Sequence, residues 1–271
     1  NGITTEMAPT TRGVHLRFSY PTTGDAYLVL DGYTDMSEIK IDPAKRQISG
    51  WVNNQRFVND SKSFRNYFVV QFDKPFEDYG VWENQKDEVF PQKLDGAGKG
   101  YGAFIKFKKG SKVQAKAASS YISAEQALIT LNKELGKDKN LEVTKARGQK
   151  TWNEVLNRIV VEGCTDEQMK TFYSCLFRAN LFSRKFYERK ENGEPYYYSP
   201  YNGKIYDGYM YTDNGFWDTF RSQFPLTNIL HPTMQGRYMN ALLAAQEQCG
   251  WLPSWSSPGE TGGMLGNHSI S

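Results

Sequence analysis

One short segment, residues 213–221, combines the side chains that carbohydrate sites use. Trp217 stands next to Asp218, and Arg221 follows three residues later. An indole packs on the C–H face of a sugar ring, a carboxylate accepts hydrogen bonds from neighbouring hydroxyls, and a guanidinium can orient that carboxylate. The alternative is an amphipathic helix with its aromatic side chains in the core and Asp218 as a solvated first-turn charge. Composition alone favours this alternative, because aromatic residues at helical spacing are usually core.

A second segment, residues 250–268, is irregular and rich in residues that line sites. It holds Trp251, Trp255, Glu260 and His268 among several glycines and prolines. Loops carry binding and catalytic residues more often than scaffold elements do. A rigid structural loop with both tryptophans buried fits the composition equally well, so both interpretations stay open.

A pair of carboxyl groups could carry out glycoside hydrolysis if they lay on opposite sides of the scissile bond. The required separation is about 5 Å for retention and about 6.5–9.5 Å for inversion. The candidates by position are Asp207, Asp213, Asp218 and Glu260. The sequence does not determine the distances between them, so no pair is assigned. Other catalytic signatures are absent, including Ser-His-Asp spacing, phosphate-binding glycine loops and HExxH or EF-hand motifs.

The composition is that of a globular protein long enough for two domains. The chain has 271 residues, 39% hydrophobic and 23% charged. Lys and Arg (33) barely outnumber Asp and Glu (30), and no basic patch favours nucleic acid. No apolar run approaches the ~20 residues of a membrane span. The 3 cysteines disfavour a disulfide framework and a zinc site, whereas the 6 Trp, 17 Tyr and 16 Phe suit cores or carbohydrate grooves.

The elements that must position the candidate residues change in kind near residue 120. Residues 1–122 hold short alternating apolar runs between turn residues, a pattern typical of an antiparallel β-sandwich. We predict strands at 14–18, 27–30, 47–52, 67–72, 103–107 and 113–115. Turns are expected at 21–24, 31–32, 96–100 and 109–110.

Beyond residue 122 the apolar period becomes helical. Ser123 with Gln126, and Thr165 with Gln168, have the spacing of capping boxes. We predict helices over 123–135, 152–160, 165–181, about 214–224 and about 232–248, with 184–212 as a long loop or small hairpin. The helix over 214–224 is expected to stop at Pro225, and His231 before Pro232 to mark a helix N-terminus. Consecutive helices separated by irregular stretches fit an incomplete α/α toroid.

The chain resembles glycoside hydrolase family 92, the calcium-dependent exo-acting α-mannosidases. The matching runs are Phe-Trp-Asp-Thr-Phe-Arg at 216–221, Gly-Trp-Leu-Pro-Ser-Trp at 250–255 and Gly-Asn-His-Ser at 266–269. Residues 11–13, 121–123, 172–178 and 225–226 support them. The order and approximate spacing fit, and the resemblance covers nearly the whole chain. The first two runs together are specific, although either alone would be weaker.

The resemblance implies a multi-domain α and β fold. An N-terminal antiparallel β-sandwich (1–122) is followed by a helical linker (123–150) and the first part of an (α/α)6 toroid (151–271), with the active site between sandwich and toroid. It also implies calcium-dependent hydrolysis of terminal α-linked mannose with inversion, in an α-1,2-type enzyme. A Glu would act as general acid, an Asp would activate water, and calcium would bind the mannose hydroxyls. The expected partner is a mannose-containing glycan, and the expected location is extracellular or periplasmic.

Five residues match segments expected to border the terminal mannose: Trp217, Asp218, Arg221, Asn267 and His268. Arg221 is expected to support Asp218. In the family, the acid, the base and most calcium ligands lie in later segments than this chain contains. We therefore expect no catalytic residue here, an inactive fragment, and further residues before Asn1. Another carbohydrate-active enzyme of this architecture, such as a glycoside phosphorylase, and a non-catalytic glycan-binding module remain alternatives.

Overall fold

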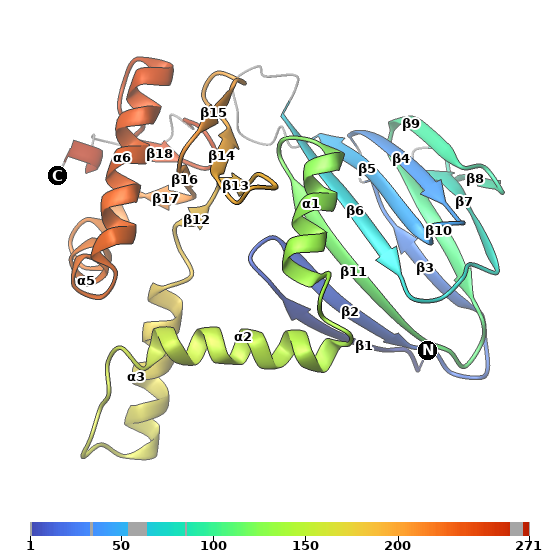
Figure 1. Cartoon of the computed structure of the whole chain (residues 1–271), viewed down its shortest axis with the longest axis horizontal. Helices are drawn as coiled ribbons and strands as arrows, with labels where there is room; N and C mark the ends of the chain where they lie inside the picture. The colour runs from blue at the N-terminus through green and yellow to red at the C-terminus, as the bar shows by residue number, and fades with distance from the viewer. Residues whose placement is uncertain (1, 33–34, 54–63, 85, 261–267, 271) are drawn as a thin grey trace. The chain divides into compact units, whose positions relative to one another are not determined.

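The computed structural model describes residues 2–32, 35–53, 64–84, 86–260 and 268–270. The chain divides into two units, which Figure 1 shows in one view. Unit 1 comprises residues 1–54 and 64–149, and unit 2 comprises residues 55–63 and 150–271. Antiparallel strands followed by helices confirm the predicted fold class. The six-fold toroid itself stays a prediction.

Unit 1 is a sandwich of two antiparallel sheets (Figure 1). The larger sheet has the order β1 (Thr4–Pro9), β2 (Gly13–Ser19), β11 (Lys112–Ser120), β6 (Arg65–Phe72), β5 (Gln47–Asn53), β4 (Met36–Asp42) and β9 (Asp95–Lys99). The smaller sheet has the order β3 (Ala26–Leu30), β10 (Tyr101–Phe107), β7 (Asp78–Glu83) and β8 (Glu88–Pro91). Alternate side chains from both sheets form one core, in which Ile39, Ile48 and Phe107 are completely or almost completely buried.

The alternating runs read from the sequence are confirmed as strands, but the turn predicted at 96–100 is wrong. Residues Asp95–Lys99 form β9, which pairs with β4. The glycines there make room for a neighbouring ring, because a Cβ on Gly96 would lie 2.3 Å from Cδ1 of Tyr101. Close packing of a side chain against bare backbone explains these glycines better than a turn does.

Helix α1 (Ala124–Leu135) begins where the sequence predicted and packs on the larger sheet. The Ser123 hydroxyl accepts a hydrogen bond from the backbone N–H of Gln126 at 3.1 Å. The next helix, α2 (Leu141–Leu156), differs from the prediction of a helix over 152–160. It starts earlier and ends before Ile159, because the β-branched run 159–161 and Gly163 are poor helix formers.

The first helix that lies wholly in unit 2 starts where the sequence predicted. In α3 (Asp166–Ala179) the complete capping box of Thr165 and Gln168 is present. The predicted hairpin region then forms short strands: β12 (Arg184–Lys185), β13 (Glu188–Arg189), β14 (Pro195–Tyr198), β15 (Ile205–Asp207) and β16 (Tyr211–Thr212). Strands β13, β14 and β15 form one small sheet, while β12 pairs with β16.

The prediction of one helix over 214–224 is wrong. Instead the chain forms β17 (Asn214–Gly215), α4 (Phe216–Thr219) and α5 (Gln223–Leu230). Pro225 lies in the first turn of α5, where its missing N–H leaves no hydrogen bond unmade. The last long helix, α6 (Pro232–Cys249), has His231 at its N-cap and Pro232 in its first turn, as predicted. It is followed by β18 (Trp255–Ser256) and the 3₁₀ turn η1 (His268–Ile270).

None of the helices among the described residues is both long enough and apolar enough to cross a membrane.

Candidate functional site

The two candidate segments of the sequence meet where β17 pairs with β18. Asn214 lies opposite Ser256 and Gly215 lies opposite Trp255. The approach at Gly215 is so close that a Cβ there would lie 2.6 Å from Cζ3 of Trp255 and 2.8 Å from Oδ2 of Asp218. A glycine is therefore needed at this position, and it places an indole beside a carboxylate. The sequence pattern of each segment gave no sign of this pairing.

The first turn of α4 separates its side chains sharply by exposure. Phe216 is 0% exposed, whereas Trp217 is 48% exposed and Asp218 is also exposed. The amphipathic-helix interpretation is thus correct for Phe216 and wrong for Trp217. Both groups expected to contact a sugar, the indole of Trp217 and the carboxylate of Asp218, are accessible to a ligand.

Two buried polar side chains hold α4 in place. Nδ2 of Asn214 donates to Oγ1 of Thr219 at 3.0 Å, and that hydroxyl donates to the carbonyl oxygen of Gly215 at 3.1 Å. Asn214 is 3% exposed and Thr219 is 9% exposed. Helix α4 has no side-chain cap, and a helix of four residues is unstable alone. These hydrogen bonds therefore replace the cap and fix the direction of Trp217 and Asp218.

Asp213, just before β17, is held by an ion pair. Its Oδ2 lies 2.7 Å from Nε of Arg184, and its backbone is left-handed, with φ 59°. Burial raises the pKa of Asp213 above its ordinary value, while the Arg184 charge opposes that rise. The ion pair therefore fixes the chain directly before β17, where the candidate segment starts.

Three of the four carboxyl candidates have partners that give them a structural role. Asp207 lies 2.5 Å from Nζ of Lys190, and Asp213 pairs with Arg184. The carboxylate of Glu260 accepts hydrogen bonds from the backbone N–H of Ser254 at 2.8 Å and from its hydroxyl at 2.7 Å. Asp218 differs, because no residue in the described part of the chain donates a hydrogen bond to it or forms an ion pair with it. Its carboxylate is exposed and therefore accessible to a ligand.

The aromatic ring of Phe220 joins the remaining candidate residues to α4. The imidazole of His268 stacks on this ring, with centroids 5.2 Å apart and planes at 18°. Cζ of Arg221 lies 5.1 Å from the same ring centroid, and among the described residues no ion pair links Arg221 to Asp218. The stack places His268 beside the segment that holds Trp217. Asn267 lies outside the described residues.

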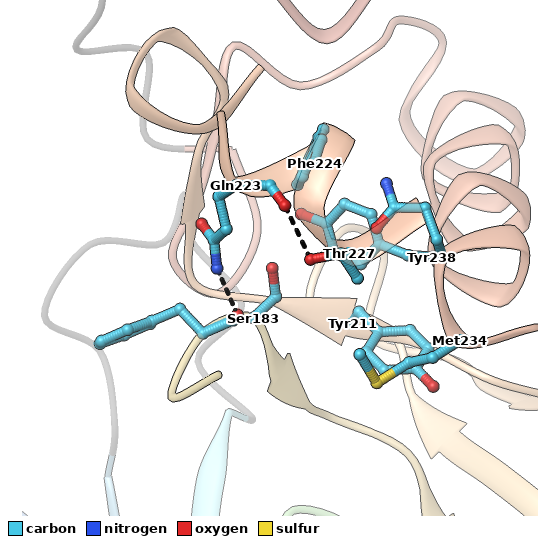
Figure 2. Close-up of a pocket in the computed structure, with 9 residues that line it drawn as sticks. Ser183, Tyr211, Gln223, Phe224, Thr227, Met234 and Tyr238 are labelled. Carbon is cyan, nitrogen blue, oxygen red and sulfur yellow. Dashed lines mark hydrogen bonds between the residues drawn. The ribbon is translucent and has the colours of Figure 1, made fainter. Parts of the chain in front are cut away.

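Residues of α5, α6 and the segments around positions 182 and 211 line a pocket in unit 2 (Figure 2). Its lining comes from segments between 182 and 238, and sequence reasoning missed it: Phe182, Ser183, Tyr211, Gln223, Phe224, Thr227, Met234, Gln235 and Tyr238. Nε2 of Gln223 donates to the carbonyl oxygen of Phe182 at 2.7 Å. The ring of Phe224 lies between those of Phe216 and Tyr238, at centroid distances of 6.4 and 5.3 Å. Burial raises the pKa of Tyr238, so its phenol stays neutral. Phe216 packs against the aromatic layer that Phe224 and Tyr238 form.

No complete metal site is present within the described residues. No group of three or more His, Cys, Asp or Glu side chains there could hold an ion, and all 3 cysteines are free. This donor set does not fit a calcium ion, which takes 6–8 oxygen ligands.

Comparison with protein families agrees with the residues that this geometry brings together. Residues 1–120 match the glycosyl hydrolase family 92 N-terminal domain, and residues 126–271 match the glycosyl hydrolase family 92 catalytic domain. The chain belongs to glycosyl hydrolase family 92. The resemblance read from the Trp-Asp-Thr-Phe-Arg and Gly-Trp-Leu-Pro runs is thereby confirmed.

Solved structures place this family 92 chain among larger proteins. It is similar to the family GH92 inverting mannosidase BT2199 from Bacteroides thetaiotaomicron VPI-5482, with 42% identity and a TM-score of 0.94, over 100% of this chain and 36% of that one. The GH92 α-mannosidase BT3965 from Bacteroides thetaiotaomicron shares the fold, with 22% identity and a TM-score of 0.86, over 99% of this chain and 37% of that one. The family 92 chain thus spans about 36% of the length of the first relative. No curated protein sequence matches it.

Proposed function

We propose that the protein hydrolyses terminal α-linked mannose residues of glycans. Membership of family 92 supports glycoside hydrolysis, and the 42% identity to an inverting mannosidase supports mannose as the sugar. The observation that carries the proposal is the accessible pair Trp217 and Asp218 at Gly215, where the two family-matching segments meet. The pair combines a ring face for the sugar C–H groups with a carboxylate for two hydroxyls.

The residues of this chain bind the sugar in the proposed reaction. The indole of Trp217 covers one face of the terminal mannose, and the Asp218 carboxylate accepts hydrogen bonds from its hydroxyls. His268, Arg221 and Asn267 complete the surroundings of that sugar. Exo action follows if these groups surround the end of the glycan rather than its middle.

The acid and base of the proposed reaction lie outside residues 1–271. Asp207, Asp213 and Glu260 already have structural partners, so none of them is assigned to proton transfer. We expect inversion of configuration, an α-1,2 preference, dependence on calcium held mostly by other residues, and an extracellular or periplasmic location. Residues 1–271 alone should then release no mannose.

The decisive experiment uses the full-length protein with α-1,2-, α-1,3- and α-1,6-linked mannobioses. We expect release of mannose, fastest from the α-1,2 dimer, with β-mannose as the first anomer seen by proton NMR. EDTA should abolish turnover, and added calcium should restore it. Cleavage that requires inorganic phosphate would instead favour the phosphorylase alternative. Mannose binding without hydrolysis would favour the glycan-binding module.

A further inference from the structure

The outer face of the smaller sheet in unit 1 carries two aromatic rings that pack on bare backbone. A Cβ on Gly102 of β10 would lie 2.2 Å from Nε1 of Trp82, and a Cβ on Gly80 of β7 would lie 2.6 Å from Cε1 of Phe104. Nε1 of Trp82 also donates to the carbonyl oxygen of Leu30 at 3.4 Å. The indole therefore starts on β7, crosses β10 at Gly102 and reaches β3. Part of each ring therefore packs on the sheet, and Trp82 and Phe104 are both half-buried.

The register extends these rings into a broad surface. Val29, Phe104, Gly80 and Pro91 lie side by side across the four strands, and the next row along the strands holds Gly102, Trp82 and Val89. Rows on one face of a sheet are about 7 Å apart. Val29 and Val89 are 57% and 59% exposed, and helix α1 packs on the other sheet. We name the outer side chains of Tyr27, Val29, Trp82, Val89 and Phe104 the aromatic platform.

Charged and polar groups border the aromatic platform. Nζ of Lys106 and Nζ of Lys109 lie 3.2 and 3.4 Å from Oδ1 of Asp25, and Nζ of Lys106 lies 5.2 Å from the ring centroid of Tyr27. The carboxylate of Asp78 accepts a hydrogen bond from the side-chain amide of Gln92. The border therefore offers donors and acceptors without an excess of either sign. This balance suits a neutral partner better than an anionic membrane surface or an acidic protein.

We propose that the aromatic platform is a second glycan-binding surface, which holds a neutral polysaccharide while unit 2 holds a terminal sugar. Aromatic rings that pack on glycines leave apolar ring surface for the C–H groups of successive sugars, and the polar border reaches their hydroxyls. A protein partner would favour projecting side chains that fill pockets, which the glycines at positions 80 and 102 do not provide. The choice of mannan as a probe rests on the proposed function, whereas the existence of the surface does not.

The test measures retardation of the full-length protein in native gels that contain yeast α-mannan, soluble starch or hydroxyethyl cellulose. Trp82→Ala and Tyr27→Ala should each weaken the apparent affinity for at least one polysaccharide by about 5-fold or more. The matched control is Met7→Ala on β1, because Met7 is 67% exposed on the larger sheet. Met7→Ala should leave the retardation unchanged. All three variants should keep kcat/KM on 4-nitrophenyl α-mannoside, since that substrate is too small to reach a second surface.

The outcomes separate this inference from the proposed function. Retardation that depends on Trp82 and Tyr27 supports the aromatic platform even if the protein hydrolyses no mannoside. Equal retardation of wild type, Trp82→Ala and Tyr27→Ala in all three gels overturns the platform, whether or not mannose is released. Binding to phosphatidylcholine vesicles that Trp82→Ala abolishes, without any polysaccharide effect, would also overturn it. Tyr27→Ala keeps the test informative if Trp82→Ala unfolds, because the Tyr27 side chain is 42% exposed.

Discussion

The imidazole of His268 stacks on the ring of Phe220, with the centroids 5.2 Å apart and the planes at 18°. These residues are 48 positions apart, yet the stack places η1 against α4. A stack of this kind orders a side chain without using its polar edge. His268 can therefore be held in place by one face while its ring nitrogens remain available to a sugar hydroxyl.

Replacement of His268 separates these two contributions. We expect His268→Ala to lower kcat/KM on α-mannobiose by roughly 10- to 100-fold, because both the stack and a hydrogen bond to sugar are lost. His268→Phe keeps the stack and should recover roughly 2- to 10-fold of that loss. Steady-state kinetics of the full-length variants provide the measurement. A Phe variant no more active than the Ala variant would contradict the ordering role of the stack.

We expect the charge of the Asp218 carboxylate to contribute more to sugar binding than its shape does. Asp218→Asn keeps the volume but removes the charge, and hydrogen bonds to a charged group contribute about 1.5–3 kcal/mol. We expect kcat/KM to fall roughly 10- to 150-fold while the melting temperature stays the same, because Asp218 is exposed and unpaired among the described residues. Glu162→Gln serves as the control, since it removes an exposed carboxylate elsewhere in unit 2. Equal activity of both variants would remove Asp218 from the sugar site.

Loss of the hydrogen bonds that hold α4 should change both the stability and the activity of the protein. Thr219→Val removes the acceptor of the Asn214 amide and leaves that buried group unpaired, at a cost of about 1–3 kcal/mol. We expect lower thermal stability together with a higher KM, because Trp217 and Asp218 lose their fixed direction. Thr165→Ala is the matched comparison, since loss of that N-cap costs about 0.5–2 kcal/mol at the start of α3. If both variants lost stability and KM changed in neither, the proposed positioning role would be wrong.

Acid should weaken the packing of α2 on the sandwich through His15, which is 1% exposed. The Thr144 hydroxyl donates to Oδ2 of Asp138 at 2.7 Å, so it accepts from Nδ1 of His15 at 2.9 Å. Burial lowers the pKa of His15 below 6.5, and Lys116 lowers it further, while Asp138, Gln114 and Glu142 raise it. Because the unfolded chain then binds the proton more readily, stability is present above pH 6.5 and is lost as the pH falls through the depressed pKa.

Hydrogen exchange can measure this effect of pH. After correction for the intrinsic exchange rate, protection of residues 13–19 and 141–149 should fall between pH 7.5 and pH 5. The loss should be smaller in His15→Gln, whose side chain carries no charge at either pH. The same fall in both proteins would show that another group causes it.

The sequence by itself determined the features that depend on neighbouring residues. Alternation identified strands such as β2 and β6, and the spacing of Thr165 and Gln168 predicted the start of α3, because a capping box is closed by residues three positions apart. The Trp-Asp-Thr-Phe-Arg run identified the family for the same reason, since a motif is a local string. The helix predicted over 214–224 failed because the local pattern does not reveal that residues 214–215 pair with a strand forty positions later.

Only the tertiary structure decided which side chains share a site. The approach of Trp255 to Gly215, the stack of His268 on Phe220, and the aromatic rings that pack on Gly80 and Gly102 all join residues that lie far apart in the chain. It also decided which carboxyl groups have partners, because the Glu260 carboxylate accepts a hydrogen bond from Ser254 only in the folded chain. Packing and desolvation depend on such long-range contacts, and neither leaves a periodic signal in the amino-acid sequence.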